Sequence, residues 1–208
     1  EHVRGGTFDT LVQQEGPLPA VRAVETVLQL IAGLEAAEAC GVLHRDIKPS
    51  NCFVDSDGVV KIGDYGLSLS MDAVEETRLT TAGTFLGTPS YASPEQVRGL
   101  PVDVRSDIYS VGATLYFMLT GRPPFSQPNT MQVLAAVLAE APVSPAQHAP
   151  AVPEALADVV LRCLRKDPAA RPATYARLRE ALLPFSRQPI RPADRSTRFR
   201  AGVVHRSQ

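Results

Sequence analysis

His44-Arg45-Asp46-Ile47-Lys48-Pro49-Ser50-Asn51 brings together an imidazole, a guanidinium, a carboxylate, an ammonium and a carboxamide. Pro49 excludes a helix interior, so the run is predicted to be a loop between more apolar segments. These groups suit phosphoryl transfer. A carboxylate can receive a hydroxyl proton, an ammonium can neutralise a moving phosphoryl group, and a carboxamide can hold Mg²⁺ through its oxygen.

The composition is that of a globular protein, with 44% hydrophobic and 21% charged residues. A net charge of −1 gives no general attraction to nucleic acid or to anionic membranes, so no nucleic-acid partner is expected. The cysteines Cys40, Cys52 and Cys163 are widely spaced, which indicates neither disulfides nor zinc. There is no secretory signal and no apolar run of the roughly 18 residues that a membrane helix needs. We expect a cytoplasmic protein, either free or the cytosolic part of a membrane-anchored parent.

Two further motifs follow this loop: Asp64-Tyr65-Gly66, and Gly87-Thr88-Pro89-Ser90-Tyr91-Ala92-Ser93-Pro94-Glu95. In this order, the three motifs resemble the catalytic loop, the metal-binding D-F-G and the A-P-E of protein kinases. Tyr65 and Ser93 stand where the family usually has phenylalanine and alanine. The Lys48-Pro49 pair is similar to that of serine/threonine kinases rather than tyrosine kinases.

The segments Pro-Pro-Phe at 123–125 and Ser-Pro-Glu-Gln at 93–96 resemble bacterial members of the serine/threonine class. The chain is therefore identified as a eukaryotic-like serine/threonine protein kinase of bacterial type.

The resemblance implies roles for four polar residues. Asp46 would be the base that accepts the proton of the substrate hydroxyl, and Lys48 would contact ATP and counter the charge of its γ-phosphoryl group. Asn51 and Asp64 would supply oxygens to Mg²⁺. The expected reaction is transfer of the ATP γ-phosphoryl group to serine or threonine of a protein substrate, with ATP and Mg²⁺ as cofactors.

The first residues, Glu1-His2-Val3-Arg4-Gly5-Gly6, resemble the hinge between the two kinase lobes. By this resemblance the Glu1 carbonyl and the Val3 amide would contact adenine, and Phe53 would form the apolar floor beneath it. No glycine-rich phosphate loop or strand lysine precedes this hinge. The expectation is thus an N-terminally truncated kinase whose small lobe is absent, nearly inactive by itself, with residues 1–185 as hinge and large lobe and 186–208 as a basic linker.

Two structural contacts are also implied by the family pattern. Asp107 would lie under the catalytic loop and accept hydrogen bonds from its backbone. Glu95 would form a buried ion pair with Arg171, joining the segment that ends in Ser-Pro-Glu to the helical part of the domain.

A regulatory device is implied as well. Arg45, next to the candidate base, would bind a phosphothreonine of the activation segment, and the candidate acceptors are Thr80, Thr81 and Thr84. The hydroxyl of Thr88 would bond both Asp46 and Lys48, which fits a serine/threonine kinase.

The predicted fold class is mainly α, a kinase-like large lobe with a small β-hairpin at the catalytic site. Ser106 is predicted to be the N-cap of the most apolar helix. Helices are expected at about 8–13, 19–40, 106–119, 129–140, 154–165 and 173–183, and the hairpin strands at 52–54 and 59–62.

Two other functions remain open from the residues. One is a pseudokinase or scaffold that binds partners without turnover, although Asp46, Lys48, Asn51 and Asp64 are all retained. The other is a small-molecule kinase of the aminoglycoside or choline type. Those enzymes share a similar catalytic loop and a later metal aspartate, but they lack the Ser-Pro-Glu motif and its paired arginine.

Overall fold

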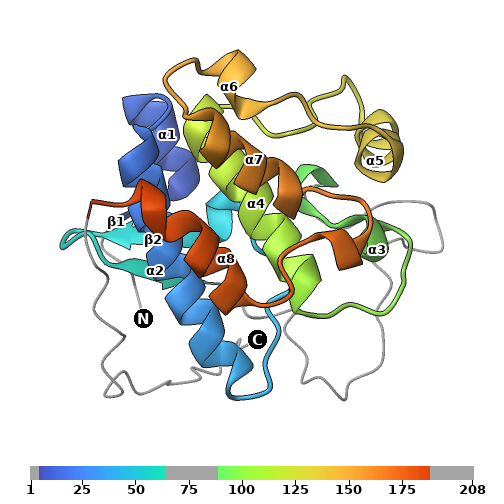
Figure 1. The fold of residues 1–208 in the computed structure, drawn as a ribbon, viewed down its shortest axis with the longest axis horizontal. Coiled ribbons are helices and arrows are strands. Elements are labelled where there is room, and N and C mark those ends of the chain that lie inside the picture. The colour runs from blue at the N-terminus through green and yellow to red at the C-terminus, as the bar shows by residue number, and fades with distance from the viewer. Residues whose placement is uncertain (1–4, 64–88, 188–208) are drawn as a thin grey trace, which may run out of the picture.

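Two long helices form the centre of the molecule, α2 (Ala20–Glu38) and α4 (Val104–Thr120). The computed structural model describes residues 5–63 and 89–187. Every residue of α4 from Ser106 to Thr120 is buried, as expected for a helix that is apolar nearly all round. Figure 1 shows α4 running through the middle of the domain with α2 beside it.

The apolar residues of α2 recur at helical spacing and face α4 and the core. The residues at most 1% exposed include Val24, Val27, Leu28, Ile31 and Leu34. The helix ends at Glu38, and Gly41 takes a left-handed turn three residues later with φ of 74°. The buried side of α2 follows the apolar spacing of its sequence, and this side packs against α4.

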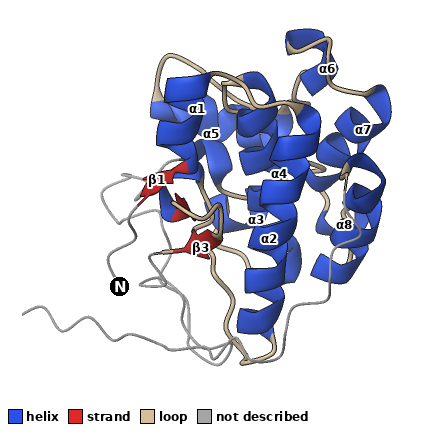
Figure 2. Ribbon diagram, turned by 90° about the vertical axis from the view of Figure 1, so that its left-hand side faces the viewer, coloured by secondary structure: helices blue, strands red, loops and turns tan. Residues whose placement is uncertain are grey.

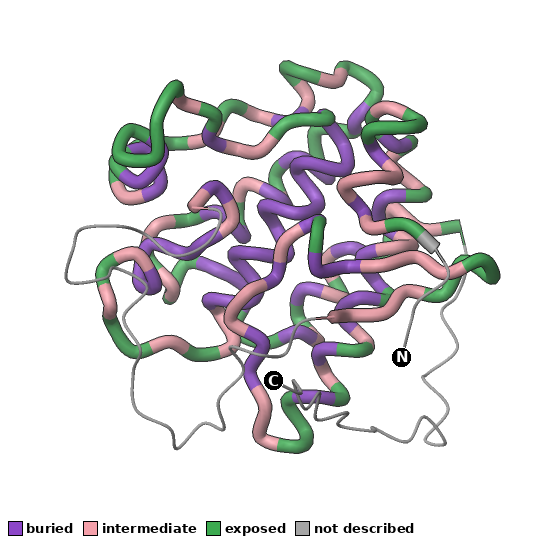
Figure 3. The backbone as a smooth tube through the Cα atoms, turned by 180° about the vertical axis from the view of Figure 1, so that it is seen from behind, coloured by how far each residue is buried: buried purple, intermediate pink, exposed green. Residues whose placement is uncertain are grey.

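Helices near the C-terminal end of the described chain cover these two. Helix α7 (Glu154–Cys163) packs on α4, and α8 (Tyr175–Leu182) packs on α2. A Cβ atom at Gly112 of α4 would come 2.4 Å from the Cβ of Cys163, so only glycine permits this approach of α4 and α7. The buried segments run through the middle of the molecule in Figure 3, and exposed residues lie mostly at its periphery.

The remaining α-helices of the described residues have ten residues or fewer: α1 (Phe8–Glu15), α3 (Pro94–Val97), α5 (Thr130–Ala139) and α6 (Pro145–His148). The expected positions of the main helices are confirmed to within a few residues. Helices α3 and α6 were not predicted, because each is a single turn that begins at a proline. None of the described helices combines the length and the apolar run required to cross a bilayer.

The N-cap assigned to Ser106 was wrong. Helix α4 begins two residues earlier, at Val104, and Asp103 is its N-cap, with the side chain accepting a hydrogen bond from the Arg105 N–H. Both residue types are good caps, so local preference could not separate them. Ser106 instead donates its hydroxyl hydrogen to Glu95.

A three-stranded antiparallel sheet lies at one side of the helices, near α1 and α2 (Figure 2). Strands β2 (Cys52–Asp55) and β3 (Val60–Ile62) form the predicted hairpin, in which Phe53 pairs with Lys61. The strand β1 (Gly5–Thr7) adds to β2 with Gly6 opposite Val54. We did not predict β1, since its glycines indicate a turn and its pairing partner is far away in sequence.

Candidate active site

The 44–51 loop lies between α2 and β2, and one buried carboxylate holds its backbone. Oδ2 of Asp107 accepts a hydrogen bond from the His44 N–H at 2.9 Å, and Oδ1 accepts one from the Arg45 N–H at 2.8 Å. The hydroxyl of Tyr175 donates to Oδ2 at 2.9 Å. Burial raises the pKa of Asp107, and the neighbouring His44 and the N–H and hydroxyl donors act against that rise. The contact expected between Asp107 and the loop backbone is present.

Arg45 adopts a backbone conformation that side chains other than glycine rarely take. Its φ is 67°, and within residues 5–63 and 89–187 no other non-glycine residue has a positive φ. Such a conformation costs about 1–3 kcal/mol and persists only where the surroundings hold it. The hydrogen bond from the Arg45 N–H to Asp107 is one such restraint. The strained residue comes directly before Asp46.

Two side chains of the loop converge on one carboxylate oxygen of Asp46. Lys48 Nζ lies 2.9 Å from Asp46 Oδ2. The Asn51 amide nitrogen donates both to that oxygen and to the Asp46 backbone carbonyl, each at 2.9 Å. The side chains of Lys48 and Asp46 are 18% and 12% exposed, so the pair is largely shielded from water but reachable by a substrate. The sequence-predicted residues Asp46, Lys48 and Asn51 therefore share one site.

His44 links this loop to the end of β3. The Asp46 N–H donates to His44 Nδ1 at 3.2 Å, so Nδ1 acts as the acceptor nitrogen of the ring. The other ring nitrogen, Nε2, lies 3.1 Å from the Gly63 carbonyl oxygen, and it therefore carries the donated hydrogen. Gly63 directly precedes Asp64 in the sequence. The buried ring thus fixes the spacing between the loop and the strand that leads to Asp64.

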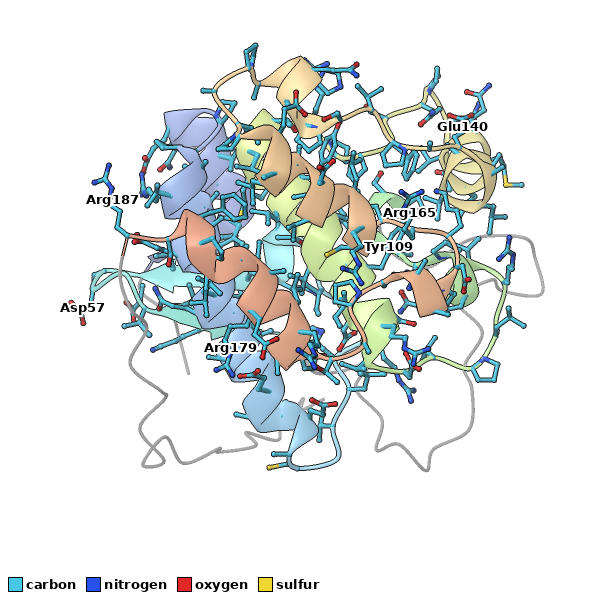
Figure 4. All side chains as sticks on the ribbon, in the orientation of Figure 1. Asp57, Tyr109, Glu140, Arg165, Arg179 and Arg187 are labelled. Atoms are coloured by element: carbon cyan, nitrogen blue, oxygen red, sulfur yellow. The ribbon has the colours of Figure 1, made fainter. Side chains whose placement is uncertain are left out.

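Glu95 and Arg171 form a buried bidentate ion pair. The two terminal nitrogens of Arg171 donate to the two oxygens of Glu95 at 2.7 and 2.9 Å, and the Ser106 hydroxyl donates to Glu95 at 2.5 Å. The remaining Arg171 donors reach backbone carbonyls, including that of Arg165 at 2.7 Å. The guanidinium also lies over the Tyr109 ring, 5.0 Å from its centroid. Figure 4 labels Tyr109 and Arg165, the two residues that Arg171 contacts beside the ion pair.

A family model for the protein kinase domain matches residues 1–182. The chain belongs to the protein kinase family. The predicted fold class is thereby confirmed: a helix-rich kinase fold with one small antiparallel sheet.

Curated relatives of this kinase chain include bacterial proteins named serine/threonine-protein kinase PknB. That of Mycobacterium leprae is 35% identical over 98% of this chain and 33% of its own length. That of Mycolicibacterium smegmatis is 38% identical over 88% of this chain and 29% of its own length. A probable PknB of Bifidobacterium longum is 34% identical over 89% of this chain and 27% of its own length. The chain thus spans about a third of these relatives or less.

Several residues singled out in the kinase sequence lie outside the described residues. They are Glu1 and Val3 of the hinge motif, Asp64, and Thr80, Thr81, Thr84 and Thr88. Phe53, the expected floor of the adenine site, lies half-buried in β2. A Cβ atom at Gly63 would come 2.6 Å from its ring, so a side chain there would displace Phe53.

Ser93 and Gln96 have a role that motif recognition missed. Ser93 is the N-cap of α3, and its hydroxyl accepts a hydrogen bond from the Gln96 N–H at 3.4 Å. The Gln96 side-chain oxygen accepts one from the Ser93 N–H at 3.0 Å, which completes a capping box. The pattern Ser-x-x-Gln was visible in the sequence, but we interpreted Ser93 only as a replacement for alanine in A-P-E.

The Glu95–Arg171 pair makes the stability of this kinase domain sensitive to acid. Burial raises the pKa of Glu95, but the hydrogen bonds from Arg171 and Ser106 outweigh burial and hold the pKa below its ordinary value. The stabilisation is thus complete above the ordinary glutamate pKa of about 4.3 and is lost as pH falls through the lower folded-state pKa. Urea unfolding is therefore expected to show that wild type loses more stability in acid than Glu95→Gln. Parallel pH profiles of the two proteins would contradict this.

Proposed function

We propose that this chain provides the catalytic loop of a serine/threonine protein kinase, which transfers the γ-phosphoryl group of ATP to a hydroxyl of a protein substrate. The observation that carries the proposal is the convergence of Lys48 Nζ and the Asn51 amide on Asp46 Oδ2. Two donors on one oxygen fix the orientation of the carboxylate, which a base needs before substrate arrives. The relatives named serine/threonine kinases support the same reaction class.

In the proposed reaction, the substrate hydroxyl oxygen bonds to the γ-phosphorus and its proton passes to the Asp46 carboxylate. The bond between the γ-phosphorus and the β,γ-bridging oxygen breaks, and ADP leaves with that electron pair. Lys48, already 2.9 Å from Asp46, is placed to counter the charge on the transferred group. Asp46 is thus the proposed base, and Lys48 the proposed phosphoryl and ATP contact.

The donor set fits Mg²⁺ at Asn51. The amide nitrogen of Asn51 donates to Asp46, and its oxygen, which the Ser50 hydroxyl approaches only at 3.5 Å, can act as a ligand for Mg²⁺, which prefers oxygen. Asp64 is the proposed second ligand. When bound, the ion would neutralise charge on the ATP phosphates. In the described ranges no cluster of three or more histidine, cysteine, aspartate or glutamate residues forms a metal site of its own.

The remaining assignments extend the proposal along the chain. Glu1 and Val3 would contact adenine by their backbone, and Phe53 would lie beneath it. Residues 1–185 would form the hinge and large lobe of the kinase domain, and residues 186–208 a basic linker. This division is supported by the family match, which ends at residue 182. Because the proposed reaction uses ATP, the domain would lie in the cytosol, where ATP is available.

Acceptor choice tests this proposal. The protein that carries this chain is incubated with Mg-ATP and a peptide array offering serine, threonine or tyrosine as the only hydroxyl acceptor. We expect phosphate on serine and threonine, because Lys48 and Thr88 match the serine/threonine pattern. Dominant transfer to tyrosine would overturn the proposed specificity. Binding of ATP without transfer to any acceptor would favour a scaffold.

Regulation by phosphorylation is a separate expectation. Arg45 would bind a phosphothreonine at Thr80 or Thr81, with Thr84 as the less favoured position, because a shielded guanidinium pairs strongly with a phosphate. Phosphopeptide mass spectrometry of active protein should find phosphate at these threonines. Fully active protein in which all three are unmodified would rule this mode of control out.

A further inference from the structure

Gln96 makes a second contact, outside the capping box, that connects α3 to the 44–51 loop. Its Nε2 donates to the backbone carbonyl oxygen of Arg45 at 2.6 Å. On the other side, its Oε1 accepts from the Ser93 N–H, which can only donate. A carbonyl can only accept, so the two partners fix which amide atom points each way. Gln96 as a residue is only 8% exposed, so this bond is protected from water.

The contacted carbonyl belongs to the strained residue of the loop. Arg45 has φ of 67°, and the peptide that begins with its carbonyl continues into the Asp46 N–H. Asp107 holds the amide nitrogen of Arg45, and Gln96 holds its carbonyl oxygen. Each bond restrains a different side of the same residue. Without the Gln96 bond, the peptide joining Arg45 to Asp46 would lose its restraint at the oxygen, and the Asp46 carboxylate could turn away from the reacting hydroxyl.

The support behind Gln96 is rigid. Its neighbour Glu95 is fixed to Arg171 and Ser106 by buried hydrogen bonds, and α3 is closed by the capping box with Ser93. Through its hydrogen bond to the Arg45 carbonyl, Gln96 therefore holds the 44–51 loop against this anchored turn. The two bonded residues are 51 positions apart in sequence. A methionine side chain would fill the same space but could make neither hydrogen bond. A glutamate could accept from Ser93 but could not, when ionised, donate to Arg45.

We propose that Gln96 is a positioning residue for phosphoryl transfer: its amide holds the Arg45 carbonyl and thereby sets the orientation of Asp46. The proposal rests on the proposed kinase function. It assigns Gln96 a role in turnover that is separate from its part in capping α3.

Three variants of the protein that carries this chain separate the two roles. Ser93→Ala weakens the capping box and leaves the Gln96–Arg45 bond in place. Gln96→Met removes both. Gln96→Glu keeps an oxygen for the Ser93 N–H and loses the donor to Arg45. For each variant, kcat, KM for ATP and the melting temperature are measured, together with hydrogen–deuterium exchange of peptides covering residues 44–51.

We expect Ser93→Ala and Gln96→Met to lower the melting temperature alike, since both lose cap hydrogen bonds. Only Gln96→Met and Gln96→Glu should lower kcat, by about 10- to 100-fold, with KM for ATP unchanged, because misplacing a catalytic group acts on the chemical step. The same two variants should speed exchange of the Asp46 amide. Equal losses of kcat in Ser93→Ala and Gln96→Met would overturn the proposal, as would wild-type kcat in Gln96→Met.

The exchange measurement keeps this inference distinct from the proposed function. If the wild-type protein shows no phosphoryl transfer, the kinase proposal fails. Faster exchange in 44–51 in Gln96→Met, but not in Ser93→Ala, would then still support the hold of Gln96 on the loop. Identical exchange in all variants would overturn that hold even in a fully active kinase.

Discussion

Replacing Asp46 by asparagine is expected to lower kcat for phosphoryl transfer by a factor of about 10²–10⁴, the usual contribution of a general base. Asparagine has nearly the same shape and keeps an oxygen that can accept from Lys48 and Asn51. It cannot accept the proton of the substrate hydroxyl at neutral pH. The substitution therefore removes the proton acceptor while leaving the packing of the loop intact. KM for ATP should change little, because the carboxylate acts on the hydroxyl acceptor.

Asp57→Asn is the matched control for this experiment. Asp57 is an exposed acid in the β2–β3 turn and is labelled at the edge of the molecule in Figure 4. Its substitution should leave kcat unchanged. An Asp46→Asn protein that keeps most of the wild-type kcat would show that another group accepts the proton. Steady-state assays with a serine peptide measure both variants.

Removing Glu95 should have the largest effect on stability. Glu95→Ala leaves Arg171, which is 2% exposed, as a buried cation without its carboxylate. Breaking one side of such a pair typically costs about 3–5 kcal/mol, because the remaining charge loses its partner and stays desolvated. The Ser106 hydroxyl also loses its acceptor. We expect a corresponding fall in the free energy of unfolding, measured by urea denaturation.

Glu154→Ala provides the comparison, since Glu154 is exposed in the first turn of α7. Loss of an exposed first-turn acid should cost no more than about 1 kcal/mol. Equal destabilisation by Glu95→Ala and Glu154→Ala would mean that the buried pair contributes nothing beyond a surface charge. The test is independent of catalysis, because neither residue contacts the reacting groups.

The main helices and the hairpin could be predicted because their signals are local. In α2, apolar residues such as Val24, Leu28 and Ile31 recur at helical spacing and are all buried. In the hairpin, Asp55 to Gly58 separates two short, mostly apolar runs, and Gly58 has the positive φ of 77° that its turn requires. The third strand, β1, depends on pairing with β2 across the chain, and nothing local indicates that pairing.

Only part of the site could be predicted from the sequence, and that part was predicted from motifs rather than from local secondary-structure signals. The convergence of Asp46, Lys48 and Asn51 joins residues within one short loop, so motif recognition located it. The Glu95–Arg171 pair spans 76 residues and was expected only because the sequence resembles kinases. The contact of Gln96 with Arg45 could not be predicted, since it involves a backbone carbonyl with no side-chain signature. The capping box that Gln96 forms with Ser93 could have been predicted from the Ser-x-x-Gln pattern, but we did not predict it.

Single-turnover transfer of radiolabelled γ-phosphate from ATP to a serine peptide, with ATP binding measured in parallel, decides whether Asp46 acts as the base in the protein that carries this chain. The wild-type protein should bind Mg-ATP and transfer the label. The Asp46→Asn variant should bind Mg-ATP equally well and transfer the label at least about 100-fold more slowly. Equal binding with no transfer by the wild type, or equal transfer by both proteins, would contradict the proposed role of the 44–51 loop.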